Sequence, residues 1–490
     1  MEKGVTELNI IEAVEGPFST WLGEPTPWLP WRSFLKSLAG VALSPDERLL
    51  FQRCTGRTQE FSKPVSEAWV VVGRRGRKSA VASLLAIHSA VFCDWSNCIA
   101  PGETARVLVI AVTKEQAKIV RSYCEALLRS HSELEALIST VDQDSISLTN
   151  GIVIQCVANS FRSIRGPAVV CAIFEELAFW RSDESATPDV EILRAVRPAM
   201  LTTKKHGALL IGISSPYAKR GLLYEKWKEH FGHDDSNVLV WHADTATMNP
   251  EVDQLEIDQA YKDDPASASS EYGAQFRDDI ANFLDSDLIA KLTRTSPLEI
   301  PPKLGINYFA FIDSSGGRGD AMTLGISHQE KDGRNILDLA RGVPAPFDPA
   351  TVVKEFASIL KSYRLNEATG DAYSGAWCAD AFKAEGITYK TSPLNKSAIY
   401  LETLPLFTQG LVELPDLRQL LVQLASLERR TARGGKDSVD HPSGKGSHDD
   451  YANSACGALH LASQGSSTDW NVGCGGPTQI PVKLPCGEGY

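Results

Sequence analysis

The stretch WVVVGRRGRKSAVASLL, residues 69–85, joins an apolar run, a basic glycine-containing loop and a helix of small residues. Backbone N–H groups of such a loop and the N-terminus of the following helix favour phosphate binding. Lys78 is placed to reach β- and γ-phosphate oxygens, and Ser79 to hold Mg²⁺. The usual loop pattern is broken where Val72 replaces the first glycine and Arg77 precedes the lysine. Alone, the stretch fits a basic turn that caps a core helix equally well.

Around this loop, apolar runs alternate with helical patterns. The expected strands cover 69–72, 106–112, 152–157, 169–174 and 208–214, and the expected helices cover 79–92 and 114–130. Apolar strands that alternate with helices predict an α/β fold with a largely parallel sheet.

Two of these strands end in residues suited to nucleotide hydrolysis. VVCAIFEE ends in Glu175 and Glu176, where one carboxylate supports Mg²⁺ and the next polarises a water molecule. ALLIGISSP ends in Ser214, Ser215 and Pro216, whose hydroxyls can sense a γ-phosphate. Each motif alone also fits an ordinary strand exit or turn. The loop, the acidic pair and the hydroxyl strand in this order predict an ATPase domain that uses ATP with Mg²⁺.

A polar loop before the acidic strand contains Arg162 and Arg165. An arginine here could stabilise transition-state charge, in cis or across a subunit interface. A solvated loop arginine is an equally good interpretation.

The second half of the chain brings aspartates to the ends of predicted elements. Asp313 and Asp371 end strands, and Asp449 and Asp450 start a helix of small residues. Carboxylates that converge repel one another unless divalent ions neutralise them. Two Mg²⁺ or Mn²⁺ ions can then activate water and stabilise the leaving oxygen of a phosphodiester, which is the logic of an RNase H-like nuclease. The alternative is ordinary capping and turn roles.

Composition limits how the chain can meet nucleic acid. Its 490 residues contain 49 Lys and Arg against 61 Asp and Glu, for a net charge of -12 and a pI near 5.4. This balance argues against a surface that coats DNA but allows local basic grooves. One basic group before the last acidic motif is predicted to contact DNA: Arg429, Arg430, Arg433, Lys436 and Lys445. No membrane span or signal peptide is visible, and ten scattered cysteines without a CxxC pair favour reduced thiols in a cytoplasm.

The chain resembles the large subunit of tailed-phage terminases. The residues that carry the resemblance are GRRGRKS (73–79), AIFEELAFW (172–180), ISSP (213–216), FIDSSGGRGD (311–320), TGDAYSG (369–375) and VDHPSGKGSHDDYANSACGA (439–458). The likeness spans roughly residues 51–462.

The resemblance implies an N-terminal ASCE-type P-loop ATPase domain and a C-terminal RNase H-like nuclease domain with a mixed sheet. It implies that Gly73, Arg74, Arg75, Gly76, Arg77, Lys78, Ser79 and Glu175 bind the nucleotide. Glu176 is then the catalytic glutamate, and Ser214, Ser215 and Pro216 form the coupling motif. Asp313, Asp371 and either or both of Asp449 and Asp450 would hold the nuclease metals.

The resemblance also implies partners and a place of action. These are double-stranded DNA, a small terminase subunit, and a portal protein on a procapsid, with a ring of copies during packaging and a monomer as an alternative in solution. The expected place is the host cytoplasm, with transient binding to the procapsid and absence from the mature virion and from membranes.

Two other function classes compete with this interpretation. A helicase-nuclease of DNA repair would need further helicase motifs and a second ATPase-like lobe after Pro216, and neither is visible. A non-catalytic DNA-binding or virion structural protein with vestigial motifs is favoured mainly by Arg77.

The expected organisation has five segments. They are a lead-in (1–60), the ATPase domain (61–280), a proline-rich linker (281–304), the nuclease domain (305–464) and a flexible tail (465–490).

Overall fold

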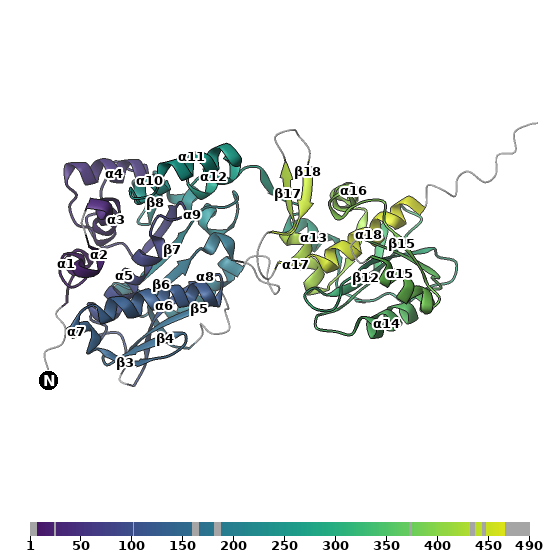
Figure 1. Cartoon of the computed structure of the whole chain (residues 1–490), viewed down its shortest axis with the longest axis horizontal. Coiled ribbons are helices and arrows are strands. Elements are labelled where there is room, and N and C mark those ends of the chain that lie inside the picture. Colours follow the sequence, from purple (N-terminus) through teal and green to yellow (C-terminus); the bar gives the residue numbers. More distant parts are fainter. Residues whose placement is uncertain are drawn as a thin grey trace, which may run out of the picture. The chain divides into compact units, whose positions relative to one another are not determined.

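The computed structural model describes residues 7–23, 26–100, 102–158, 166–180, 188–371, 375–431, 437–442 and 447–465. The chain divides into two compact units, Met1–Ala281 and Asn282–Tyr490, next to the predicted end of the first domain (Figure 1). Among the helices of these residues, none is both long and apolar enough to cross a lipid bilayer.

The first unit is a sheet covered by helices. Its strands are β1 (Glu67–Val72), β2 (Ala105–Ala111), β3 (Ile138–Val141), β4 (Ser145–Leu148), β5 (Ile152–Ala158), β6 (Ala168–Glu175), β7 (Leu209–Ser214) and β8 (Leu239–Ala243). Its longer helices are α3 (Leu29–Ala39), α4 (Pro45–Thr55), α5 (Lys78–Val91), α6 (Lys114–Arg129), α8 (Pro188–Ala199), α9 (Gly221–His230) and α11 (Gln254–Asp263). The shorter ones include α1 (Ile10–Glu15), α2 (Ser19–Leu22), α7 (Ser132–Glu135), α10 (Thr245–Met248) and α12 (Pro265–Glu271).

The strand order of this sheet is β3-β4-β5-β2-β6-β7-β1-β8. All pairs from β5 to β8 are parallel, and only the β3-β4-β5 edge is antiparallel. Two strands, β6 and β7, thus lie between β1 and β2, which are consecutive in the chain. This is the strand order of ASCE-type P-loop ATPases, and it confirms the predicted fold class.

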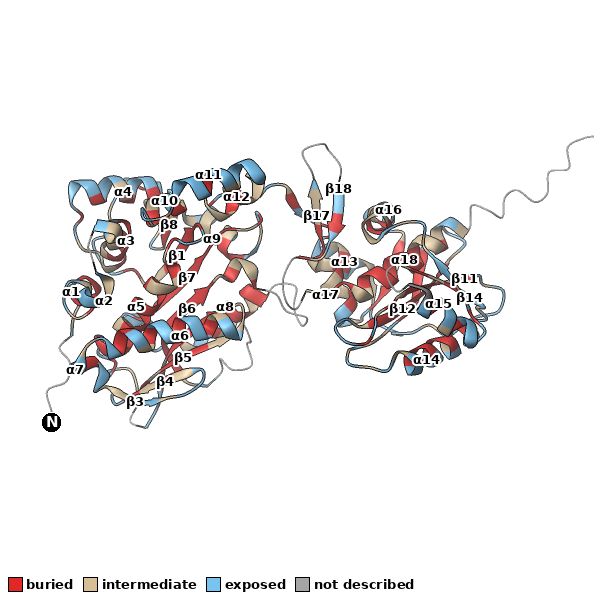
Figure 2. Ribbon diagram, in the orientation of Figure 1, coloured by how far each residue is buried: buried red, intermediate tan, exposed pale blue. Residues whose placement is uncertain are grey.

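The central strands are apolar because both faces of the sheet are covered. Every residue of β6 and β7 is buried, and so is all of β1 except its first residue (Figure 2). Polar residues appear where these strands end, and since the strands are parallel, their carboxyl ends meet at one edge.

The N-terminal segment is more ordered than the predicted lead-in. It forms α1 to α4, and the side chains of Trp31, Phe34 and Phe51 are fully buried in the core of the first unit. Phe34 meets Trp241 of β8 edge to face at 5.7 Å. These three aromatic residues of the predicted lead-in are therefore core residues.

The second unit also has a central sheet. Its strands are β10 (Thr293–Arg294), β11 (Tyr308–Asp313), β12 (Met322–Gln329), β13 (Asn335–Val343), β14 (Glu367–Gly370), β15 (Thr388–Thr391) and β16 (Val412–Pro415). Its helices are α13 (Ser286–Leu292), α14 (Pro349–Ser362), α15 (Gly375–Ala384), α16 (Lys396–Thr408), α17 (Arg418–Ser426) and α18 (Asp450–Gly465). Strands β17 (Glu428–Thr431) and β18 (Asp437–Asp440) pair as a hairpin, and β9 is Ile280–Asn282.

The order of this sheet is β10-β16-β13-β12-β11-β14-β15. β12 is antiparallel to both of its neighbours, whereas β14 and β15 run parallel to β11. The mixed order β13-β12-β11-β14-β15 is that of the RNase H-like fold, as predicted.

Small residues let α18 approach this sheet closely. A Cβ added at Gly457 would lie 2.2 Å from the Phe311 ring, and one added at Gly325 would lie 2.4 Å from Ser454 O. The small-residue pattern of the last helix therefore reflects its close packing on the sheet, which places the first half of α18 next to β11 and β12.

The segment predicted as a linker, 281–304, differs from that expectation in its first half. It contains α13, and Phe283, Leu284 and Ile289 are buried in the core of the second unit. The apolar residues of this stretch precede the prolines that suggested a linker, so the two signals belong to different parts of the segment.

Candidate active sites

The loop between β1 and α5 is a tight turn with strained residues. Gly76 N–H donates to Gly73 O at 3.2 Å. Gly73 has no room for a side chain, because a Cβ there would lie 2.3 Å from Thr245 Oγ1. Arg75 and Arg77 have φ values of 62° and 63°, in the left-handed region that costs such residues on the order of 1–2 kcal/mol. Packing around the loop must therefore hold this shape.

The start of α5 is open for an anion. Arg77 is its N-cap and makes no side-chain capping bond. Within the described residues, the amides of Lys78 and Ser79 have no protein acceptor. Free amides at the positive end of a helix favour phosphate.

Lys78 lies inside the site, where the sequence placed it. Its side chain is only 6% exposed, and Nζ donates to Ser215 Oγ at 2.8 Å. The same atom donates to the carbonyls of Val72 and Gly73 at 3.1 Å and lies 3.2 Å from Glu176 Oε1. The lysine thus touches both the coupling motif and the second carboxylate.

Arg77 points to other parts of the first unit. Its guanidinium pairs with Glu251, donates to Pro27 O at 3.1 Å and lies 4.7 Å from the centre of the Trp28 ring. The side chain therefore does not crowd Lys78, and any contact of Arg77 with a phosphate is left to its backbone.

The two arginines before it differ from each other. Arg74 Nη1 pairs with Glu271 Oε1 at 3.0 Å, whereas the side chain of Arg75 is exposed. The side chains of Arg74 and Arg77 thus each pair with an acidic residue in the structure.

Glu175 ends β6 in a buried position. It is 3% exposed and accepts a hydrogen bond from Ser79 Oγ. Burial raises its pKa to about 7, the charge of Glu176 adds to this shift, and Ser79 and Lys78 oppose it. A divalent cation would neutralise such a carboxylate, so Glu175 with the Ser79 hydroxyl fits a magnesium-supporting pair.

Glu176 contacts the hydroxyl strand directly. It has a left-handed φ of 50°, and its Oε2 accepts from Ser215 N–H at 2.9 Å and from Ser214 Oγ at 3.1 Å. Pro216 is anchored by Ser270 Oγ, which donates to its carbonyl at 3.0 Å. The predicted coupling motif and the predicted catalytic glutamate are therefore in hydrogen-bond contact.

Arg162 and Arg165, the candidate arginine fingers, lie outside the described residues.

Three aspartates gather at one end of the second sheet. Ile312 of β11 pairs with Gly370 of β14, so Asp313 at the end of β11 and Asp371 directly after β14 follow a paired position, and α18 brings Asp450 to the same region. Burial raises the pKa of Asp313 well above its usual range, and the charges of Asp371 and Asp450 add to the shift. Burial also raises the pKa of Asp450 to about 6, despite a 3.2 Å hydrogen bond from Ala321 N–H.

Asp449 has a different environment from its neighbour. It is 5% exposed, lies 2.9 Å from Lys396 Nζ through Oδ2, and accepts a hydrogen bond from Tyr400 at 2.9 Å. Lys396 also pairs with Asp440 at 2.8 Å. Asp449 is already neutralised by a lysine, which makes Asp450 the better candidate for a metal ligand.

The donor set of this site suits a hard cation. Asn453 donates to Asp313, and its own Oδ1 is buried without a partner in the described part of the chain. Carboxylate and amide oxygens are the ligands that Mg²⁺ and Mn²⁺ prefer. In the ranges that the structure describes, no three His, Cys, Asp or Glu side chains stand close enough to hold a metal together.

The predicted DNA-contact residues are partly described. Arg429 pairs with Asp437 at 2.8 Å across the β17–β18 hairpin, and Arg430 pairs with Glu428 at 3.0 Å. Arg433, Lys436 and Lys445 lie outside the described residues.

Sequence reasoning missed Asn453, Lys396 and Tyr400. Asn453 follows Asp450 by one helical turn, so its spacing could have placed it on the same face. Lys396 and Tyr400 lie on α16, some fifty residues before the motif, and no local pattern links them to it.

The chain is similar to solved structures of phage large terminases. The HK97 bacteriophage large terminase is 14% identical with a TM-score of 0.36, over 81% of this chain and 91% of that one. A large terminase from a thermophilic bacteriophage is 9% identical with a TM-score of 0.37, over 82% and 94%. The large terminase nuclease of another thermophilic phage, G20c, is 16% identical with a TM-score of 0.30, over 37% and 98%. No family model and no curated protein matches the sequence.

Proposed function

We propose that the chain is the large subunit of a tailed-phage terminase, with an ATP-hydrolysing first unit and a DNA-cutting second unit. The observation that carries this proposal is the contact of Lys78 with both Glu176 and Ser215 at the carboxyl edge of the first sheet. A structural loop would not need a buried lysine, a catalytic carboxylate and a hydroxyl strand within one hydrogen-bonded group.

The first unit binds ATP with Mg²⁺. Open amides at the start of α5 and the Lys78 ammonium hold the phosphates, while Ser79 and Glu175 hold the magnesium ion, which neutralises phosphate charge. Glu176 orients the attacking water and accepts its proton.

Hydrolysis is coupled to movement through β7. Ser215 bonds to Lys78 through its hydroxyl and to Glu176 through its amide. Lys78 and Glu176 exchange these contacts for phosphate and water when nucleotide binds, so the β7 end responds to the nucleotide state. That response moves an element that grips double-stranded DNA.

The second unit cuts phosphodiester bonds. Asp313, Asp371 and Asp450 hold two Mg²⁺ or Mn²⁺ ions, which supply an activated water and stabilise the leaving oxygen. Asn453 fixes the orientation of Asp313, and Lys396 holds Asp449 beside the cluster.

The partners follow from this function. The chain translocates double-stranded DNA into a procapsid through a portal protein, acts as a ring of copies, and takes its cut site from a small terminase subunit. It works in the host cytoplasm. Phosphate contacts by Arg429, Arg430 and the three basic residues outside the described ranges position the DNA without reading its sequence.

ATP hydrolysis tests the first half of the proposal. The wild-type chain should hydrolyse ATP with Mg²⁺, faster with double-stranded DNA, and Lys78→Ala should abolish this turnover. Absence of turnover in the wild type, or equal turnover in Lys78→Ala, would contradict the motor.

Plasmid cleavage tests the second half. Mn²⁺ or Mg²⁺ should support cleavage by the wild type, and Asp313→Ala should abolish it. Cleavage that persists in this variant would place the chemistry elsewhere. Neutralising the five basic residues should weaken DNA binding and lower its salt dependence.

A further inference from the structure

Three consecutive carbonyls of the loop between β1 and α5 are held by side chains from distant segments. Thr245 Oγ1 donates to Arg74 O at 2.7 Å, Asn249 Nδ2 donates to Arg75 O at 2.8 Å, and Trp31 Nε1 donates to Gly76 O at 2.9 Å. We call Trp31, Thr245 and Asn249 the carbonyl clamp.

Such bonds set the direction of the backbone amides. In a trans peptide, the C=O of one residue and the N–H of the next point to opposite sides. Holding the carbonyls of Arg74, Arg75 and Gly76 outward therefore turns the amides of residues 75–77 away from the clamp. Gly76 N–H closes the turn onto Gly73 O. The amides of Arg75 and Arg77 have no protein acceptor in the described residues, like those that open α5.

The three clamp residues lie in two segments that are far apart in the sequence. Trp31 lies on α3, and Thr245 and Asn249 lie at and just after α10, which follows β8. Trp31 and Thr245 are fully buried. The same two parts of the chain also contact the Arg77 guanidinium. Pro27 and Trp28 lie just before α3, and Glu251 lies just after Asn249.

The loop needs such support more than a glycine-rich one would. Arg75 and Arg77 adopt left-handed φ values without the freedom of glycine, and Val72 stands where a first glycine is usual. Without outside bonds the loop would relax to other conformations and its amides would diverge.

We propose that Trp31, Thr245 and Asn249 are positioning residues that shape the phosphate cradle and so set the affinity of the first unit for nucleotide. This proposal rests on the proposed binding of ATP by that unit. Each clamp residue bonds to a carbonyl of the loop, so its effect on the nucleotide is exerted through the loop.

The same unit offers a matched control for each clamp residue. Thr203 Oγ1 donates to Val169 O at 2.6 Å, Asn150 Nδ2 to Ala90 O at 2.7 Å, and Trp95 Nε1 to Ser89 O at 2.8 Å. Thr203 is fully buried, like Thr245.

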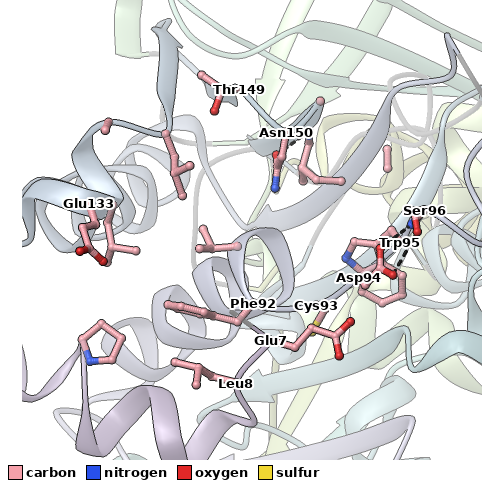
Figure 3. A pocket seen from close by; sticks show the side chains of 18 of the residues that line it. Glu7, Leu8, Phe92, Cys93, Asp94, Trp95, Ser96, Glu133, Thr149 and Asn150 are labelled. Carbon is pink, nitrogen blue, oxygen red and sulfur yellow. Dashed lines mark hydrogen bonds between the residues drawn. The ribbon is translucent and has the colours of Figure 1, made fainter. Parts of the chain in front are cut away.

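The controls lie far from the cradle. Ser89 and Ala90 are near the end of the 14-residue helix α5, about 15–20 Å along it from Lys78. Trp95 and Asn150 line a cavity (Figure 3) that also includes Ala105 and Ile152, the first residues of β2 and β5, whereas the loop follows the carboxyl end of β1.

The experiment measures the Kd of ADP with Mg²⁺ by calorimetry on the full chain. Thr245→Val, Asn249→Leu and Trp31→Phe should each weaken binding about 3- to 10-fold, the range that one neutral hydrogen bond supplies. The double variant Thr245→Val/Asn249→Leu should lose about 10- to 100-fold. Thr203→Val, Asn150→Leu and Trp95→Phe should stay within about 2-fold of the wild type, because their bonds do not reach the loop.

Two further readouts separate positioning from a general structural defect. The KM for ATP should rise in the clamp variants while kcat stays within about 2-fold, since cradle shape acts on bound substrate and transition state alike. Thr245→Ser, which keeps the hydroxyl, should restore most of the affinity. Asn249 is partly exposed, so Asn249→Leu remains a test even if a buried variant fails to fold.

Clamp variants that bind ADP as well as their matched controls would overturn the proposal. If the wild-type chain binds no ADP, the proposed ATPase function itself fails. These two results are distinguishable because the first requires binding by the wild type.

Discussion

The two proposed active sites differ in whether their charged side chains have partners of opposite charge. In the first unit, Glu176 faces the Lys78 ammonium at 3.2 Å and accepts from the Ser215 amide. In the second unit, burial and the charges of Asp371 and Asp450 raise the cost of ionising Asp313, and Lys396 pairs with Asp440 and Asp449. The first site is a compensated group of charges, whereas the second accumulates negative charge.

The two sites should therefore differ in what prepares them for catalysis. A site with internal partners can hold its catalytic groups in place before substrate arrives, and nucleotide then replaces those partners. A site of mutually repelling carboxylates gains most from an added cation. The first site should therefore depend on loop geometry, and the second on metal.

The largest effect should come from removing one carboxylate of the second unit. Asp313→Asn should slow plasmid cleavage at least about 10³-fold, because the stabilisation supplied by metal ions is worth several kcal/mol. Asp348→Asn, at an exposed helix N-cap in the same unit, is the control and should cut normally. Equal cleavage by the two variants would show that the aspartate cluster is not the cutting site.

A somewhat smaller effect is expected in the first unit. Glu176→Gln should reduce kcat for ATP hydrolysis about 10²- to 10³-fold and leave the Kd for ADP nearly unchanged, since the loss falls on the attacking water. Glu256→Gln, on the exposed face of α11, should retain full activity. A variant of Glu176 that loses nucleotide affinity but not kcat would assign this residue to binding.

The aspartate cluster of the second unit should also affect the stability of the folded chain, which can be measured without an activity assay. Asp313 and Asp450 have raised pKa values, so these two side chains bind more protons in the folded chain than in the unfolded one. Their contribution to the free energy of unfolding should therefore fall as pH rises from about 4, the usual aspartate pKa, through the folded pKa values. In EDTA at pH 7.5, Asp313→Asn should raise the Tm by about 2–4 °C.

Added Mg²⁺ should reverse the difference in Tm between the wild type and Asp313→Asn. Mg²⁺ at 10 mM should raise the Tm of the wild type, increasingly so toward high pH, and should have little effect on Asp313→Asn. A wild type whose Tm ignores both EDTA and Mg²⁺ would contradict an uncompensated metal site.

The smallest effect is expected at Arg77. Its side chain pairs with an exposed glutamate and stacks on Trp28, so Arg77→Gly should change ATP hydrolysis less than about 5-fold. Glycine also accepts the left-handed φ of this position. A loss as large as that of Lys78→Ala would mean that the arginine side chain acts on the phosphates.

Much of both sites was predictable because each motif follows an apolar strand. Glu175, Ser214 and Asp313 stand at strand ends, and the parallel register brings such ends together. Both folds follow from the same strand pattern.

The rest depends on contacts between distant segments. Trp31 bonds to a loop 45 residues later, and Asn249 to the same loop 174 residues earlier, so no local periodicity marks either. The predicted lead-in (1–60) and linker (281–304) contain residues buried in the two cores, such as Phe34 and Ile289, because their burial depends on contacts with distant segments.

The most direct test of two chemically separate sites is a paired assay on one preparation each of Lys78→Ala and Asp313→Asn. ATP hydrolysis and plasmid cleavage in Mn²⁺ without nucleotide are measured side by side. Lys78→Ala should lose hydrolysis and keep cleavage, and Asp313→Asn should do the reverse. Loss of both activities in either variant, or of neither in both, would contradict the assignment.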